Sequence, residues 1–199
     1  MKIIILLFLF INLIAQDKYS IKVAYGEASQ SNLGEIIFGD FSSHPINLSV
    51  IAIDGGYLLA KDIYDMPIDI YVKAGLSYFN EGSYKDPIYE GVIYIKAYYN
   101  LDAWDNRVRF GIAEGFSYTT NILLCEHLEA MEKFDNTSKF LNYLDISIDF
   151  DVGKLVGYKP LEDTYFGWAI KHRSGIAGLI NDVSHGGSNY NTLYIESNF

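Results

Sequence analysis

Apolar side chains recur at every second position along most of this sequence, and this period constrains the fold more than any other feature. Between positions 107 and 118, one set of alternate residues is large and apolar except at Glu114, whereas the other set is basic or small. Similar alternation begins at Ile68 and at Leu141. Successive side chains of a β-strand point to opposite faces of its sheet, so the pattern predicts strands with one apolar face and one polar or small face.

About eight segments of this kind follow one another, and an even number is expected for a closed bacterial barrel. They lie near residues 18–29, 46–61, 67–80, 87–101, 106–119, 139–153, 163–175 and 188–199. The connections at 65–67, 102–106 and 154–162 are short, whereas those at 30–45, 80–86, 120–138 and 176–187 are mostly longer. Short periplasmic turns and long extracellular loops are typical of outer-membrane proteins. We therefore predict an all-β fold, an eight-stranded antiparallel transmembrane β-barrel.

The second face of the predicted strands carries charges of both signs. Seven bases and six acids share it, namely Lys22, Lys73, Lys96, Arg107, Arg109, Lys171, Arg173, Asp54, Asp69, Glu90, Asp145, Asp149 and Asp151. Side chains just fill the interior of an eight-stranded barrel, so we predict a paired plug and no aqueous pore. The apolar face must then meet lipid. A secreted soluble barrel that binds a ligand is the alternative, and the charged inner face argues against it.

Composition excludes several classes of function. The 199 residues include 25 acids and 15 bases, a formal net charge of −10, which makes nucleic acid an unlikely partner. The single cysteine, Cys125, has no partner for a disulfide within the chain. The sequence contains no GxSxG elbow, P-loop, HExxH motif or dinucleotide fingerprint, so catalysis would need a site specific to the barrel. We expect no cofactor and no metal ion.

The chain opens with a segment that resembles a targeting sequence. Lys2 precedes an apolar run over positions 3–15 that only Asn12 interrupts, and polar residues follow from Gln16. The run is shorter than the ~20 residues that a membrane-spanning helix needs. We predict a secretory signal peptide over residues 1–15 or 1–16 and a single barrel domain over 17–199, placed in the outer membrane after cleavage. A buried N-terminal strand is the alternative.

Two features do not fit the strand pattern. Glu114 falls on the outward face, where a charge that meets hydrocarbon is costly unless it lies near an interface or a bulge. The segment 122–134 has helical spacing and predicts a short surface helix. Its Glu126, His127 and Glu129 do not have the spacing of a recognised metal site.

The seventh predicted strand ends in two residues that suit nucleophilic catalysis. Alternation places His172 and Ser174 on the lipid-facing side, about 6.6 Å apart along the strand at ~3.3 Å per residue. A serine becomes a nucleophile when a base takes its proton, and a nearby histidine is such a base. The histidine needs a third group to fix its tautomer. Asn189, on the same face of the final strand, is the candidate for that group.

The sequence from His172 to Tyr190, HRSGIAGLINDVSHGGSNY, resembles the H-x-S-N-x-G segment and following loop of the lipid A 3-O-deacylases, the PagL-type outer-membrane barrels. That family uses the histidine and serine of this motif with a glutamate that opens the last strand. The resemblance implies that His172 is the base and Ser174 the nucleophile of an esterase that removes an ester-linked acyl chain. It also implies lipid A, within lipopolysaccharide of the outer leaflet, as the partner.

The chain departs from the family pattern at two positions. Asn189 stands in place of the glutamate, so it orients the imidazole without contributing charge. Gly175 stands in place of an asparagine linked to oxyanion stabilisation and leaves only a backbone N–H there, for which Asn142 is a candidate substitute. Asp182 and Glu196 are alternative acids, ranked below Asn189. These departures keep a second function open, a non-catalytic outer-membrane barrel with an envelope-structural or surface-contact role.

Overall fold

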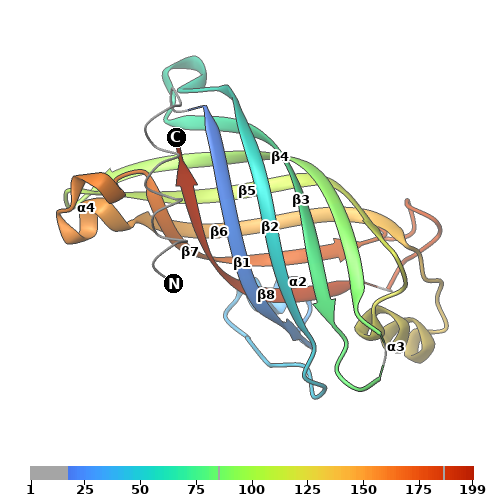
Figure 1. Cartoon of the computed structure of the whole chain (residues 1–199). Coiled ribbons are helices and arrows are strands. Elements are labelled where there is room, and N and C mark those ends of the chain that lie inside the picture. Colours follow the sequence, from blue (N-terminus) through green and yellow to red (C-terminus); the bar gives the residue numbers. More distant parts are fainter. Residues whose placement is uncertain (1–17, 85, 186) are drawn as a thin grey trace.

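The computed structural model describes residues 18–84, 86–185 and 187–199. Eight strands form one closed antiparallel barrel in which each strand pairs with its sequence neighbours and β8 pairs with β1 (Figure 1). They are β1 (Tyr19–Ser29), β2 (Ser49–Ala60), β3 (Ile68–Asn80), β4 (Ile88–Ala103), β5 (Asn106–Thr119), β6 (Phe140–Asp151), β7 (Thr164–Ser174) and β8 (Ser188–Asn198). The predicted barrel is confirmed. The predicted signal peptide at 1–15 or 1–16 lies outside the described residues.

The connections differ between the two ends of the barrel. At the turn end, where β1 begins and β8 ends, β2 and β3 are joined through η1 (Ile63–Asp65), and β6 and β7 through α4 (Val152–Val156) and η2 (Lys159–Leu161). The opposite, loop end carries α2 (Leu33–Ile37) between β1 and β2, and α3 (Leu124–Lys133) between β5 and β6. The predicted helix within 122–134 is therefore confirmed, whereas two helical turns replace the plain short turn expected at 154–162. No helix in the described part of the chain is long and apolar enough to cross a membrane.

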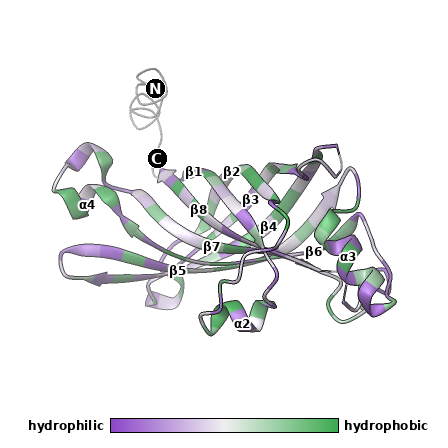
Figure 2. Cartoon of the chain, turned by 90° about the horizontal axis from the view of Figure 1, so that it is seen from below, coloured by the Kyte–Doolittle hydropathy of each residue, from purple (hydrophilic) through white to green (hydrophobic). Residues whose placement is uncertain are grey.

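The outer wall of the barrel is apolar and exposed. Its exposed side chains include Ile51, Ile53, Leu76, Ile93, Ile95, Phe110, Ile112, Phe116, Leu193 and Ile195. Hydrophobic and hydrophilic residues alternate along the strands in Figure 2. A continuous apolar surface of this extent is unfavourable in water and suits the hydrocarbon of a bilayer. In a closed barrel every strand edge is paired, so the wall leaves no open sheet edge to face lipid.

Ion pairs fill the lumen, as the charged second face predicted. Lys22 lies 3.0 Å from Asp54, and Lys73 lies 2.6 Å from Glu196, with all four side chains nearly inaccessible. Arg109 donates two hydrogen bonds of 2.8 Å to Asp149, and Lys171 lies 2.6 Å from Glu90. Three charged residues of this face differ: Arg107 pairs with Asp102 at the partly exposed rim, whereas Asp69 accepts a hydrogen bond from the Asn100 amide and Asp151 accepts from the backbone N–H groups of Lys154 and Asp163. The lumen is thus a paired plug.

Helix α3 closes the loop end of the barrel. Leu123 and Leu124 pack into a buried apolar cluster with Phe79, Ile88 and other residues at the mouth. Beneath this cluster, Glu126 accepts a hydrogen bond from the buried Arg173. These contacts fix the helix over the barrel, so that its final turn projects toward the ends of β7 and β8.

Candidate active site

Strand register brings the predicted site residues together on the outward face near the loop end. Ser174 lies directly opposite Asn142 across the β6–β7 pair. His172 lies opposite Asn189 across the β7–β8 pair. Directly opposed residues on one face of an antiparallel pair have Cβ atoms roughly 5 Å apart. The side chains of these four residues are therefore neighbours.

His172 is held by a chain of two hydrogen bonds. Its Nδ1 lies 2.7 Å from Oδ1 of Asn189, and Nδ2 of Asn189 donates to the carbonyl oxygen of Ser31 at 3.0 Å. Because the amide nitrogen is directed at Ser31, the oxygen of Asn189 faces the imidazole, and an amide oxygen can only accept. Nδ1 of His172 therefore carries the proton. In the neutral ring this leaves a lone pair on Nε2, the tautomer that a general base requires.

Ser174 shares a cavity of about 180 Å³ with His172 and Asn189. Within the described residues the Ser174 hydroxyl makes no hydrogen bond, so it is free to rotate. Two residues on one face of a strand stand about 6.6 Å apart along it. A hydroxyl can turn back toward an imidazole over that span. The geometry thus places the two side chains together without a hydrogen bond between them.

Gly175 and Asn142 differ in what they can offer beside Ser174. Gly175 is buried beneath Val183, and a Cβ at this position would clash with the Val183 carbonyl oxygen. No side chain fits there while the loop keeps this position, so Gly175 can supply only its backbone N–H. Asn142 lies across from Ser174, and it is 6% exposed. Its amide is accordingly the candidate side-chain donor beside the serine.

Helix α3 adds two charged residues that the sequence did not associate with the site. Glu129 and Lys133 line the same cavity as His172 and Ser174, and the carboxylate and ammonium groups are 2.7 Å apart. Glu129 also interacts electrostatically with the His172 ring. Sequence reasoning weighed Glu129 only as a metal ligand together with Glu126 and His127. The structure separates Glu129 from Glu126, which points into the barrel, and no cluster of metal-ligating side chains occurs among the described residues.

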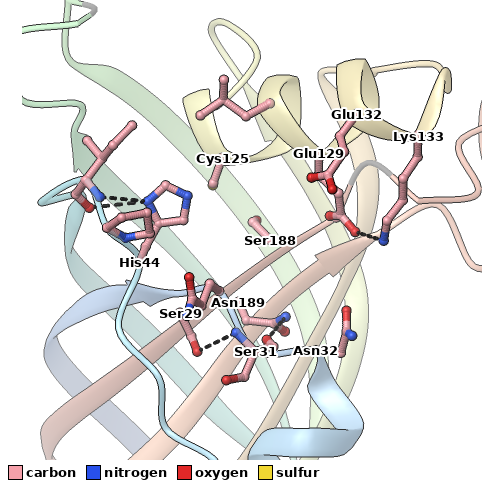
Figure 3. Close-up of a pocket in the computed structure, with 15 residues that line it drawn as sticks. Ser29, Ser31, Asn32, His44, Cys125, Glu129, Glu132, Lys133, Ser188 and Asn189 are labelled. Atoms are coloured by element: carbon pink, nitrogen blue, oxygen red, sulfur yellow. Dashed lines mark hydrogen bonds and ion pairs between the residues drawn. The ribbon is translucent and has the colours of Figure 1, made fainter.

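A second cavity, of about 480 Å³, adjoins the first (Figure 3). The two share lining residues from three parts of the chain, namely Asn32, Glu129, Lys133, Gly187 and Asn189. In Figure 3, Ser31 and Asn189 lie on one side of this cavity and Glu132 on α3 lies on the other. Most of the lining residues carry hydroxyl, amide or charged groups, and Ile46, Cys125 and Leu128 add apolar surface, so the larger cavity can accept a polar group. The smaller cavity adds His172 and Ser174 of β7 to these shared residues.

The main alternative acids lie elsewhere. Glu196 is buried in the lumen, where it pairs with Lys73 at 2.6 Å. Asp182 is exposed on the loop that follows β7 and is not among the residues that line either cavity. Neither carboxylate takes the place beside His172 that Asn189 occupies.

Comparison with known proteins identifies the architecture. No protein-family model matches the sequence, and no curated protein matches it. The fold is similar to the crystal structure of the outer membrane enzyme PagL, with a TM-score of 0.59 and 11% identity over 90% of this chain and 99% of that chain. Neisserial surface protein A is similar with a TM-score of 0.49 and 12% identity, over 92% of this chain and 98% of that chain. At this identity the likeness to PagL establishes the fold alone, an eight-stranded barrel of the outer-membrane type.

Proposed function

We propose that this protein is an outer-membrane serine esterase that hydrolyses an ester-linked acyl chain of lipopolysaccharide. The observation that carries the proposal is the hydrogen bond of 2.7 Å between Nδ1 of His172 and Asn189, beside Ser174 in one cavity. The resemblance of the sequence around His172 to the lipid A deacylases supplies the substrate class. In outer-membrane barrels the long loops face outward, which supports a site at the outer leaflet.

The first half of the reaction forms an acyl-enzyme. Nε2 of His172 takes the proton from the Ser174 hydroxyl, and the oxygen attacks the ester carbonyl carbon of the substrate. The Asn142 amide and the Gly175 N–H are donors for the negative oxygen of the tetrahedral intermediate. As the intermediate collapses, the bond between carbonyl carbon and ester oxygen breaks, and His172 returns the proton to the departing alcohol.

Water completes the reaction. Nε2 of His172 takes a proton from a water molecule, whose oxygen attacks the acyl carbon on Ser174. Collapse of the second tetrahedral intermediate releases the fatty acid, and the proton on His172 returns to the serine oxygen. Asn189 stays bonded to Nδ1 in both halves and prevents the ring from turning.

The shape of the surface around the site fits an amphiphilic substrate. Below Ser174 the outward face of β6 is apolar, with Leu144 and Ile146 at alternate positions. Acyl chains can lie along this wall, which suits hydrocarbon. The polar cavity of about 480 Å³ can then hold part of the headgroup. An ester between the two regions would be adjacent to Ser174.

A non-catalytic barrel with an envelope role is the second candidate. Two observations favour it: an uncharged amide at Asn189, and a buried Gly175 that leaves no room for a side-chain donor. Asn189 can orient a histidine but does not stabilise the imidazolium by charge. A barrel that retained its scaffold and lost the reaction would show this combination.

The two candidates are separated by the lipid A of a deletion strain that carries wild-type protein or the Ser174→Ala variant at equal levels in the outer membrane. Mass spectrometry should show loss of one acyl chain with the wild type only. Ser184→Ala is the matched control, because Ser184 lines the same small cavity on the neighbouring loop. We expect this control to behave as the wild type.

Identical lipid A in all strains, with folded protein in each, would reject the esterase and favour the non-catalytic barrel. Equal loss of the acyl chain with wild type and Ser174→Ala would reject Ser174 as the nucleophile.

A further inference from the structure

The connection between β1 and β2 folds back onto the outside of the barrel. We call residues 30–45 the strap. It begins directly after β1, and its far end is tied back to β1, because the Ser29 hydroxyl donates to the Ser42 carbonyl at 2.8 Å and His44 N–H donates to the Ala28 carbonyl at 2.9 Å. Helix α2 lies in the loop that these bonds close, and Figure 2 shows it outside the barrel wall. The strap is thus a loop that leaves the rim, runs over the outer surface of the barrel and returns to the rim.

Side chains of the strap cover part of the wall below the candidate site. The ring of Phe41 meets the ring of Trp168 of β7 edge to face, with centroids 5.5 Å apart. Ile36 is 1% exposed, although α2 lies on the outside of the barrel. Ile170 of β7 is also 1% exposed, whereas alternation predicts that it faces lipid. Ile170 is the next outward position of β7 after Trp168, which the strap contacts, so we infer that the strap also covers Ile170.

The strap also presents large apolar side chains that stay largely exposed, including the part of Phe41 that does not contact Trp168. Phe38 is 92% exposed, and Ile37 and Phe41 are each more than half exposed. Exposing three such side chains on one short segment to water would be unfavourable. The charged residues of the strap are locally satisfied, since Glu35 accepts a hydrogen bond from the Asn32 N–H and Asp40 accepts one from the Ser42 hydroxyl.

We propose that Ile37, Phe38 and Phe41 insert into the acyl region of the outer leaflet, as a lipid-binding extension of the barrel wall. The partner is lipid because the strap lies on the apolar wall, and its exposed face continues that surface. The two carboxylates of the strap limit how deeply it inserts into the leaflet. Glu35 and Asp40 must stay in the headgroup layer, because carrying a carboxylate into hydrocarbon costs several kcal/mol in a bilayer.

Insertion of the strap would also act on the candidate site, a step that rests on the proposed function. Ser31, at the start of the strap, accepts the hydrogen bond from Asn189 that directs the amide oxygen toward His172. Asn32 and Leu33 of the strap line the small cavity beside Ser174. Lipid contact that holds the strap against the wall therefore holds Asn189 in the orientation that the base requires. Catalysis should then depend on a bilayer.

Tryptophan quenching tests the insertion without any reference to activity. The native Trp104 and Trp168 are replaced by phenylalanine, and one tryptophan is introduced by Phe38→Trp. The protein is folded into phosphatidylcholine vesicles whose acyl chains carry bromine near the headgroup. Tyr84→Trp is the matched control, because Tyr84 is an exposed aromatic residue on another loop at the same end of the barrel.

We expect strong quenching of the Phe38→Trp variant and little quenching of the Tyr84→Trp variant. Equal, weak quenching of both would overturn the proposal. Weak quenching of the Phe38→Trp variant in a protein that dimerises in the vesicles would also overturn it. A second copy of the chain, and not lipid, would then cover Phe38.

Kinetics test the coupling to the site. The double variant Ile37→Ser/Phe38→Ser is compared with wild type on an ester lipid in vesicles and on a short-chain ester dispersed in detergent. We expect the ratio of the vesicle rate to the detergent rate to fall about tenfold, as loss of buried apolar surface would produce. An unchanged ratio would reject the coupling. If wild type hydrolyses neither ester, the proposed function fails, whereas the quenching result still decides whether the strap inserts.

Discussion

Asn189 is the residue on which the chemistry of the site depends most. Its amide orients His172 through one hydrogen bond and is itself oriented by another to the strap. It carries no charge, so a protonated imidazole gains less from it than from a carboxylate. The nearby Glu129 adds negative charge at longer range, although its carboxylate is shared with Lys133. A single carboxylate can both orient the imidazole and supply negative charge to it. Here Asn189 supplies the orientation and Glu129 supplies the charge.

This division leads to a prediction about substitutions at position 189. Asn189→Ala removes the acceptor for Nδ1 and should lower kcat/KM by roughly 100-fold, the lower end of what a positioned base contributes. Asn189→Asp keeps an acceptor and adds charge, so kcat should exceed that of the wild type at neutral pH. Both rates are measured on an ester lipid in vesicles. Asn191→Ala, one outward position further along β8, is the control, and equal rates for all four proteins would contradict the assigned role.

Glu114 is exposed on the outward face of β5, as the alternation predicted. It lies opposite Ile95 of β4 and Leu144 of β6, so its neighbours across both strand pairs are apolar. A carboxylate on this face lowers stability relative to an apolar residue. Glu114→Leu should therefore raise the free energy of unfolding in vesicles by about 1 to 2 kcal/mol.

Reversible denaturant unfolding measures this difference, with Ile112→Leu, the preceding outward position, as the control. A loss of stability in Glu114→Leu would show instead that the carboxylate has a favourable partner in the membrane.

Among the elements, the loop after β7 is hydrogen-bonded to the connection between α3 and β6, and one carboxylate of that connection, Asp135, binds two of its backbone N–H groups. Asp135 accepts hydrogen bonds from the backbone N–H groups of Ser184 and His185. The pKa of Asp135 is lowered, first by the N–H of Asn136 and then by those of His185 and Ser184. The ionised form therefore ties the loop over Gly175 to the connection that carries Glu129. We call Asp135 and the N–H groups of Ser184 and His185 the latch. It keeps the loop after β7 and helix α3, which line the small cavity, in place relative to each other.

A lowered pKa determines how the latch responds to pH. The ionised carboxylate contributes stability above the unperturbed pKa of about 3.9, and that contribution is lost as pH falls through the lower pKa of the folded protein. Hydrogen exchange of the Ser184 and His185 amides, corrected for its intrinsic pH dependence, should stay slow from pH 7 to about 5 and accelerate only below about 3.9. Asp135→Asn should accelerate it at every pH. Protection that is unchanged in this variant would contradict the latch.

The predictable elements are those with a periodic signal. Each of the eight strands is long enough for alternation to define it, and α3 repeats its apolar positions at helical spacing. The His172–Asn189 pair was also predictable, because it sits in one hairpin whose two strands are identifiable. Helix α2 has five residues and too few turns for a pattern. Its link to the site joins Ser31 to Asn189, and a contact between residues so far apart in sequence depends on how the barrel closes.

For the whole molecule, the central question is how a barrel with charges inside remains stable. Glu196 is fully buried and lies 2.6 Å from Lys73 and 3.6 Å from Arg109. It also accepts a hydrogen bond of 2.9 Å from Tyr98. Removing charges from water is costly, and such pairs recover that cost only when their geometry is complete. The plug therefore makes closure of the barrel dependent on every pair forming together.

The last prediction follows from this dependence. Glu196→Ala leaves Lys73 and Arg109 short of negative charge inside the barrel and should lower the free energy of unfolding by about 3 to 5 kcal/mol. The double variant Lys73→Met/Glu196→Met removes both charges of this pair and should recover most of that loss. Asp102→Ala, which breaks the exposed pair with Arg107 at the rim, should cost less than about 1 kcal/mol. Denaturant unfolding in vesicles measures the free energy of unfolding of all three variants. If Glu196→Ala and Lys73→Met/Glu196→Met lose equal stability, apolar side chains cannot replace the ion pair.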